Sequence, residues 1–466
     1  MVKKPNILFI LLDDLGWADL SCYGSDFYET PNLDRLATKS MRFTDAYAAC
    51  PVCSPTRASI MSGKYPARLG LTNYISWENP GHQDRCRLID APYIPYLDTT
   101  EKSLAKTLKE NGYATWHFGK WHLGEAAYWP DKHGFEVNVG GCHFGQPGNG
   151  YFSPYHIPNI EDGPDGEYLT DRLTDEAIKR VRENDDKPFF MNLWYYTVHT
   201  PIQGKPDLVH KYERKARAMG LDKVKTYEEG EMHPKSESVK NRVRRRLVQS
   251  DPEYAAMVEC MDTNLGRLLD VLEDKGDLDN TIIIFTSDNG GLATSEGSPT
   301  CNAPLNEGKG WMYEGGTREP LIVSWPGVTE ANSFCSVPVT STDFYPTILE
   351  MVGADPQPQQ HLDGVSMVPL LKGENKLERD AIFWHFPHYG NQGGTPGSSI
   401  RSGDWKLIEF YEDCRIELYN LREDVGETTN LAGLRPDLTR QLHERLKEWR
   451  SGMEALEPEV NPDWRW

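Results

Sequence analysis

The sequence has no long apolar run. None of its apolar stretches approaches the roughly 20 consecutive residues that a membrane-spanning helix needs. The first apolar segment ends in two aspartates and is not followed by a small-residue cleavage site, which argues against a signal peptide. We therefore expect a cytoplasmic protein, or a periplasmic or secreted one if a signal has been removed.

A regular cysteine framework is also missing. The nine cysteines are odd in number and irregularly spaced, which favours free thiols in a reducing compartment over a set of disulfides. Cys50 and Cys53 are formally a C-x-x-C pair. Pro51 and the Pro-Thr-Arg that follows Ser54 disfavour a redox or zinc role for that pair.

Positive charge is scarce. The formal net charge is −20, and a surface of that sign repels nucleic acid and acidic membranes, so we expect neither as a partner. A local exception is the basic run at 240–246, which lies within a highly charged insertion at about 203–250. A solvated helix or a rim beside the substrate is favoured for this insertion, and a nucleic-acid patch is the alternative.

The chain does contain alternating strand and helix patterns. Continuous apolar runs at 6–12 and 281–285 are typical of strands buried on both faces of a sheet. Further strands are expected at 189–195 and 321–325, and helices at 32–40, 103–111, 171–184 and 254–275. This alternation predicts an α/β fold with a large doubly wound mixed sheet flanked by helices.

The composition changes after about residue 353. Short strand signals and a final amphipathic helix follow, at 381–385, 399–401, 405–410, 416–420 and 437–449. We expect a large α/β domain over residues 1–360. A smaller C-terminal subdomain, an antiparallel sheet plus a helix, is expected over 361–466.

Oxygen-bearing side chains follow two of the predicted strands. Asp13 and Asp14 end the first apolar run, and Asp288 and Asn289 follow the second. Ligands of open α/β sheets collect at the carboxyl ends of strands, where these residues lie. Their oxygens suit a hard cation, Ca²⁺ or Mg²⁺, and not zinc. A solvated strand end and a plain Asx turn are the alternatives for the two pairs.

The most informative motif is Cys53-Ser54-Pro55-Thr56-Arg57. Pro55 favours the first turn of a helix and Ser54 can cap it, which would place Cys53 at a helix N-terminus where backbone N–H groups favour an anion. Arg57 would share a helical face with Cys53. Taken alone, the motif is also compatible with a buried thiol beside an ordinary helix start.

Basic side chains recur in three further motifs. Lys120 and His122 are two residues apart, so on an extended segment they project to the same side. His199 lies in a Val-His-Thr-Pro segment, and Lys309 lies in a Gly-Lys-Gly turn that is too short for a phosphate-binding P-loop. In this order, from about residue 6 to about residue 431, the motifs resemble those of the formylglycine-dependent sulfatases of the alkaline phosphatase superfamily.

The resemblance implies a sulfuric ester hydrolase whose 1–360 domain is catalytic. It implies that a separate formylglycine-generating or radical maturation enzyme oxidises Cys53 to formylglycine. The hydrated aldehyde would attack sulfur, carry a covalent sulfo group and then expel sulfate. One Ca²⁺, or Mg²⁺, would be held by Asp13, Asp14, Asp288, Asn289 and the converted Cys53.

The resemblance also implies roles for the basic residues. Arg57 and Lys120 would hold the formylglycine oxygen and the metal ligands, and His122 would assist the release of sulfate. His199 and Lys309 would bind sulfate and protonate the leaving oxygen, a role that suits a histidine with a pKa near neutrality.

The substrate is less legible. The acidic surface makes a small or terminal sulfated group easier to admit than a polysulfated polymer, and a sulfated carbohydrate is the first expectation. An aryl or steroid sulfate, a phosphonate or phosphate diester, and non-catalytic binding of sulfated ligands are the alternatives. The oligomeric state is unknown. Candidates for the mouth of the site, with core packing as the alternative, are Trp77, His143, Trp384, His385, His388, Tyr389 and Arg401.

Overall fold

A mixed sheet forms the centre of the computed structural model, which describes residues 3–76, 86–185, 187–235 and 241–464. Its strands are β1 (Asn6–Leu12), β2 (Met41–Tyr47), β4 (Ala114–Gly119), β5 (Val137–Val139), β6 (Phe189–Trp194), β9 (Thr281–Ser287), β10 (Arg318–Ser324), β11 (Ser333–Cys335) and β12 (Val339–Thr340). Their order is β11-β2-β10-β9-β1-β6-β4-β5, with β12 also pairing with β2. β1 lies in the middle, parallel to both β6 and β9, whereas β10 is antiparallel to its neighbours β2 and β9.

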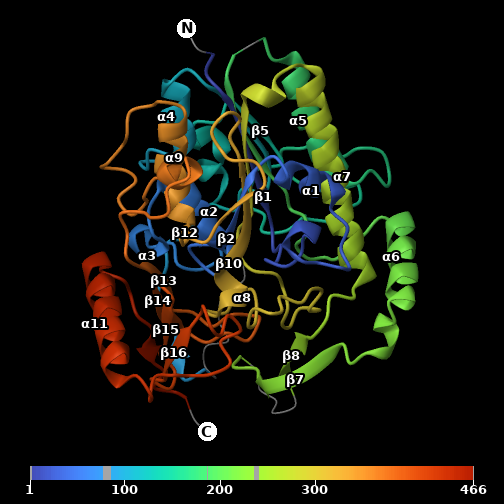
Figure 1. The fold of residues 1–466 in the computed structure, drawn as a ribbon. Helices are drawn as coiled ribbons and strands as arrows, with labels where there is room; N and C mark the ends of the chain where they lie inside the picture. The colour runs from blue at the N-terminus through green and yellow to red at the C-terminus, as the bar shows by residue number, and fades with distance from the viewer. Residues whose placement is uncertain (1–2, 77–85, 186, 236–240, 465–466) are drawn as a thin grey trace.

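Helices cover both faces of this sheet. One face carries α1 (Pro31–Ala37), α5 (Leu169–Glu183) and α7 (Pro252–Asp274), and the other carries α2 (Cys53–Ser62), α4 (Leu104–Glu110), α9 (Phe344–Met351) and α10 (Val368–Leu371) (Figure 1). Alternate residues of β1 enter the two cores: Leu8 and Ile10 pack on the first face, Ile7 and Phe9 on the second. Burial on both faces explains the continuous apolar run, and the predicted α/β fold class is confirmed.

A second, four-stranded sheet follows near the C-terminus. Its antiparallel strands are β13 (Ile382–Phe386), β14 (Gly397–Ser402), β15 (Trp405–Phe410) and β16 (Ile416–Asn420). Helix α11 (Pro436–Met453) packs Leu442 and Leu446 against Ile400 and Leu407 of this sheet. The antiparallel sheet with one helix was predicted, whereas a domain boundary at residue 360 stays a prediction.

Further α-helices and strands lie outside the two sheets and the helices that cover them. They are α3 (Pro66–Leu69), α6 (Pro206–Ala218), α8 (Glu314–Thr317), β3 (Leu88–Ile89) paired with β17 (Glu459–Val460), and the hairpin of β7 (Tyr227–Met232) and β8 (Arg242–Arg246). No helix among the described residues is long and apolar enough to cross a bilayer.

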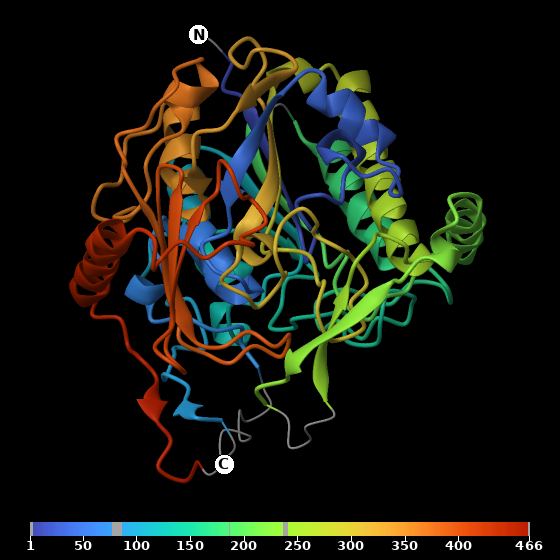
Figure 2. The same cartoon turned by 60° about the horizontal axis from the view of Figure 1, so that its bottom comes forward.

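The charged insertion is therefore a helix followed by a hairpin. Figure 2 shows the hairpin reaching forward from α6 below the main sheet. Its register places Glu228 opposite Arg245 and Glu229 opposite Arg244. These cross-strand pairs set acidic side chains against the basic run, which weakens the nucleic-acid alternative.

Candidate functional site

The oxygen-bearing residues meet at the carboxyl ends of β1 and β9. The two strands are paired in parallel up to Leu12 and Ser287, so the residues that follow lie side by side. The Asp14 backbone N–H donates to Asp288 Oδ1 (3.3 Å), and Asn289 Nδ2 donates to Asp14 Oδ1 (2.8 Å). Asp13, Asp14, Asp288 and Asn289 are all buried.

Three cationic side chains face these carboxylates. Lys120 Nζ lies 2.7 Å from Asp13 Oδ2, and Lys309 Nζ lies 2.8 Å from Asp14 Oδ2. Arg57 Nε donates to Asp288 Oδ2 (2.8 Å) and its Nη1 donates to the Lys120 carbonyl (2.9 Å).

Cys53 is the first residue of α2 and is 3% exposed. Val52 is the N-cap residue, and no side chain caps the helix, so the predicted Ser54 cap is wrong. Ser54 Oγ instead accepts from the Ile75 N–H (3.2 Å) and bonds to His122 Nδ1 (3.2 Å). These partners lie beside the helix start, which draws the hydroxyl away from the backbone N–H groups of the first turn.

His122 lies directly beside the reactive position. Its Nδ1 is 3.3 Å from Cys53 Sγ, and its Nε2 is 2.7 Å from the Ile75 carbonyl oxygen. A carbonyl only accepts, so Nε2 carries the proton and Nδ1 is free to accept one. Burial, and then Lys120, hold the pKa of His122 well below its usual value.

His199 and Lys309 contact each other. His199 Nδ1 lies 2.9 Å from the Thr200 carbonyl, so Nε2 accepts from Lys309 Nζ (2.9 Å). Burial and the neighbouring ammonium lower the pKa of His199 to about 3, which differs from the near-neutral value expected from the sequence. Although burial alone would lower the pKa of Lys309, Asp14 raises it above its usual value.

The oxygen cluster fits a hard cation. Ligand atoms of Asp13, Asp14 and His199 lie within 4.8 Å of one another. Among the described residues, Asp13 Oδ1 and Asn289 Oδ1 are buried without a hydrogen-bond partner. Burial raises the pKa of Asp13 to about 8 even though Lys120 opposes the shift, so this carboxyl lacks sufficient positive charge around it. Carboxylate and amide oxygens are the ligands that Ca²⁺ and Mg²⁺ prefer.

A cavity of about 680 Å³ opens above Cys53. The predicted residues His122, His199 and Lys309 line it. Sequence reasoning missed other lining residues on its loops, namely Tyr74, Phe144, Gln146, Glu296, Asn391 and Gln392. Isolated polar residues in loops carry no periodic signal. The proximity of Glu296 to the Asp288-Asn289 motif was the one available hint.

Most of the predicted mouth residues lie in the core instead. Trp384 is 1% exposed and donates its Nε1 to the Ala48 carbonyl, and His388 bonds to Thr72 Oγ1 (2.8 Å). His385, Tyr389 and Arg401 are also buried. Core packing is thus the correct alternative for these five. His143 is half-buried and does not line the cavity around Cys53, and Trp77 lies outside the described residues.

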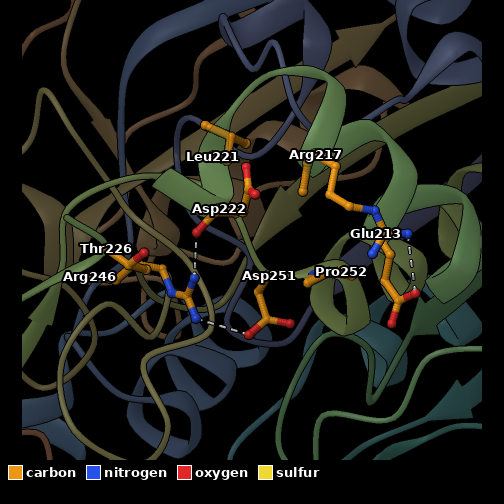
Figure 3. A pocket seen from close by; sticks show the side chains of 10 residues that line it. Glu213, Arg217, Leu221, Asp222, Thr226, Arg246, Asp251 and Pro252 are labelled. Atoms are coloured by element: carbon orange, nitrogen blue, oxygen red, sulfur yellow. Dashed lines mark hydrogen bonds and ion pairs between the residues drawn. The ribbon is translucent and has the colours of Figure 1, made fainter. Parts of the chain in front are cut away.

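A second hollow, of about 370 Å³, lies at the root of the insertion (Figure 3). Its ionic side chains pair with one another. Arg246 Nη2 lies 3.0 Å from Asp251 Oδ2, and Arg217 Nη2 lies 3.9 Å from Glu213 Oε2. This mutual neutralisation favours a structural role that ties β8 and α6 to the start of α7.

Comparison with known proteins identifies the family. The profile described as Sulfatase matches residues 5–354, and the profile described as N-sulphoglucosamine sulphohydrolase, C-terminal, matches residues 307–452. The chain belongs to the sulfatase family, the type I sulfatases of the alkaline phosphatase superfamily, and is a sulfuric ester hydrolase. Members of this family generally use formylglycine and a metal ion.

Individual relatives match over most of the chain. A protein named sulfatase from Formosa agariphila is 34% identical, covering 96% of this chain and 89% of that protein. N-acetylglucosamine-6-O-sulfatase from Bacteroides thetaiotaomicron is 29% identical, with 92% and 83% covered. The crystal structure of Ps i-CgsB in complex with k-i-k-neocarrahexaose is 30% identical with a TM-score of 0.74, and 99% of this chain and 94% of that chain are covered.

Proposed function

We propose that this sulfatase hydrolyses a sulfate ester of a carbohydrate with a formylglycine made from Cys53 and one Ca²⁺. The observation that carries the proposal is the position of Cys53, buried at a helix N-terminus within 3.3 Å of His122 and on the same cavity as Lys309. The carbohydrate substrate rests on relatives: one is named N-acetylglucosamine-6-O-sulfatase, and one was crystallised in complex with k-i-k-neocarrahexaose.

Asp13, Asp14, Asp288 and Asn289, with the converted residue 53, would hold the metal. When bound, the metal supplies positive charge for the sulfate, and formylglycine supplies a hydrated aldehyde as nucleophile. Lys120 and Arg57 orient the ligand carboxylates, because each donates to one of them while fully buried. Three buried cations face these carboxylates, and a divalent ion would add the positive charge that Asp13 lacks and that the anionic ester needs.

Proton handling falls to the residues around the cavity. His122 Nδ1, 3.3 Å from Cys53 Sγ, would accept a proton from the converted residue 53, since its Nε2 proton is bound to the Ile75 carbonyl. Lys309 carries the protons of this pair, because His199 Nε2 accepts from it, and both side chains line the cavity. The pair therefore binds the sulfate and protonates the departing sugar oxygen.

Sulfate release tests the proposal. Protein coexpressed with a maturation enzyme would be assayed with 4-nitrophenyl sulfate and with hexose and hexosamine sulfates that differ in sulfate position. Mass spectrometry would verify conversion at position 53, and Cys53→Ala would be the control. Release from a sugar sulfate that is lost in the variant supports the proposal. Release only from the aryl ester would refute the carbohydrate part, and faster turnover of phosphonate esters would favour the diesterase alternative.

A further inference from the structure

The cavity has a second polar region away from Cys53. Glu296, Asn391 and Gln392 line it, from two loops that lie far apart in the chain. They share the cavity with Cys53 and Lys309. The alcohol portion of an ester bound beside Cys53 and Lys309 would therefore share the cavity with these side chains.

Gln392 fixes the position of the Glu296 carboxylate. Gln392 is 3% exposed and donates its Nε2 to Glu296 Oε2 (3.0 Å). The backbone carbonyl of Gln392 accepts from Trp311 Nε1 (3.2 Å), which holds this part of the loop in place. A Cβ at Gly310, which has φ +79°, would lie 2.4 Å from Gln392 Oε1, so the glycine beside Lys309 makes room for this amide.

The charged insertion supports the loop that carries Glu296. The Arg246 N–H donates to the Ala293 carbonyl (3.0 Å), and the Ser295 N–H donates to the Arg244 carbonyl (3.1 Å). These bonds attach the loop to β8 as an added edge. The insertion thus supports, from outside the cavity, the loop whose Glu296 lines it.

The same insertion holds the second loop. His233 Nε2 donates to the Asn391 carbonyl (2.9 Å), and Lys235 Nζ donates to Asn391 Oδ1 (3.1 Å). Both polar loops are therefore held by hydrogen bonds from the same insertion. The insertion fixes how Glu296 and Asn391 are placed on the cavity.

The charge of Glu296 is the unusual feature. Its side chain is exposed and lines the cavity, and among the described residues its one hydrogen-bond donor is Gln392. Lys309 and Lys235 interact with it electrostatically, but neither approaches within ion-pair distance. Burial, and then this carboxylate, raise the pKa of the Tyr74 hydroxyl to about 12, which agrees with their shared position on the cavity. A carboxylate that reaches no cation within ion-pair distance keeps free acceptor positions for a ligand that donates hydrogen bonds to it.

We propose that Glu296, held by Gln392 and flanked by Asn391, binds hydroxyl groups of the sugar that carries the sulfate and disfavours a second anionic group on that sugar. Hydroxyls donate to a carboxylate at a modest cost, whereas a second sulfate or a uronate would be repelled by it. This inference rests on the proposed carbohydrate sulfatase activity and names the chemistry of the leaving group.

The test compares three probes on matured enzyme: 4-nitrophenyl sulfate, N-acetylglucosamine 6-sulfate and glucosamine 2-N,6-O-disulfate. Monosulfated hexosamines of other regiochemistry are included, and the one that the wild type cleaves fastest serves as the reference. Glu296→Gln keeps the size of the side chain but removes its charge, and Glu296→Ala removes both. Glu330→Gln, an exposed acid remote from the cavity, is the matched control.

Glu296→Gln should reduce the preference for the monosulfated over the disulfated sugar about tenfold in kcat/KM. Glu296→Ala should reduce the ratio of kcat/KM for the monosulfated sugar to that for 4-nitrophenyl sulfate about tenfold, mainly through KM. Unchanged ratios in an enzyme that cleaves sugar sulfates would overturn this inference alone. A wild type that cleaves the aryl ester but no sugar sulfate would overturn the proposed substrate and this inference together.

Discussion

The ammonium group of Lys406 joins the two sheets through buried charge. It lies 2.9 Å from Glu314 Oε1 and 3.0 Å from Glu427 Oε1, and all three side chains are fully buried. Lys406 belongs to β15, whereas Glu314 starts α8 just before β10 of the main sheet. Lys406→Met keeps most of the length of the side chain and removes its charge.

The expected change in the free energy of unfolding depends on the partners that the two glutamates keep after Lys406→Met. Glu314 keeps the Tyr47 hydroxyl (2.7 Å) and Arg318 (3.2 Å), but Glu427 keeps only the backbone N–H of Glu314 (2.6 Å). Removing one partner of a buried pair typically costs about 3–5 kcal/mol. Burial already raises the pKa of Glu427 to about 8, so this carboxyl can stay protonated. We therefore expect Lys406→Met to lower the free energy of unfolding by about 3 kcal/mol, the lower end of that range.

Urea unfolding followed by tryptophan fluorescence measures the loss. The pKa of Glu427 is raised on folding, so its contribution to stability is full below about pH 4.5 and is lost as pH rises through its folded value. Lys406→Met removes a positive charge and so raises the folded-state pKa of Glu427 further. The decrease in the free energy of unfolding caused by this variant should therefore be larger at pH 9 than at pH 6. Adding Glu427→Gln should recover part of the loss.

Arg440→Met is the matched control for Lys406→Met. Arg440 pairs with Asp437 on the surface, where the two side chains are 66% and 93% exposed, and we expect a change within about 0.5 kcal/mol. If Lys406→Met lowers the free energy of unfolding no more than this control does, the buried cluster does not couple the two sheets.

Two further variants test other parts of the molecule. Arg245 Nε donates to both carboxylate oxygens of Glu307 (2.7 and 2.8 Å), which lies two residues before Lys309. Arg245→Gln should therefore lower kcat/KM about tenfold on sugar and aryl sulfates alike. A decrease in kcat/KM that is confined to sugar sulfates would contradict this. Burial without a counter-ion among the described residues raises the pKa of Glu319 well above its usual value, so its stabilising contribution is lost as pH rises from about 4.5 through the folded value. Glu319→Gln should then stabilise the protein by about 1–2 kcal/mol at pH 7 and less at pH 5, and an unchanged urea midpoint at pH 7 would argue against it.

Strands buried on both faces were the easiest part of the fold to predict. β1 and β9 consist almost wholly of apolar residues because helices cover both sides of them. The patterns of β2 and β4 were missed, since β2 contains Arg42 and Asp45 and β4 contains Thr115 and His117. Their polar groups are bonded to distant segments: Arg42 donates to the Cys22 carbonyl, for example. Such partners are not visible in the local sequence.

The same contrast holds at the site. Asp13 and Asp288 could be placed because each follows a recognisable strand, and parallel pairing brings strand ends together. Glu296 could not, because its position depends on hydrogen bonds from an insertion whose hairpin had no clear periodicity. Trp384 and His385 were ambiguous for another reason: aromatic side chains on a C-terminal strand suit sugar stacking and core packing equally.

The central place of β1 also bears on how the chain is made. Asn6 bonds to Thr281 across 275 residues of sequence, and β1 pairs along its whole length with β9. At synthesis rates of roughly 5–20 residues per second, the first strand waits about 15–55 s for this partner to leave the ribosome. During that interval an apolar strand edge is open to aggregation or to chaperones. The ion pair between Arg57 and Asp288 also cannot form during that interval, so Cys53 stays accessible until folding buries it.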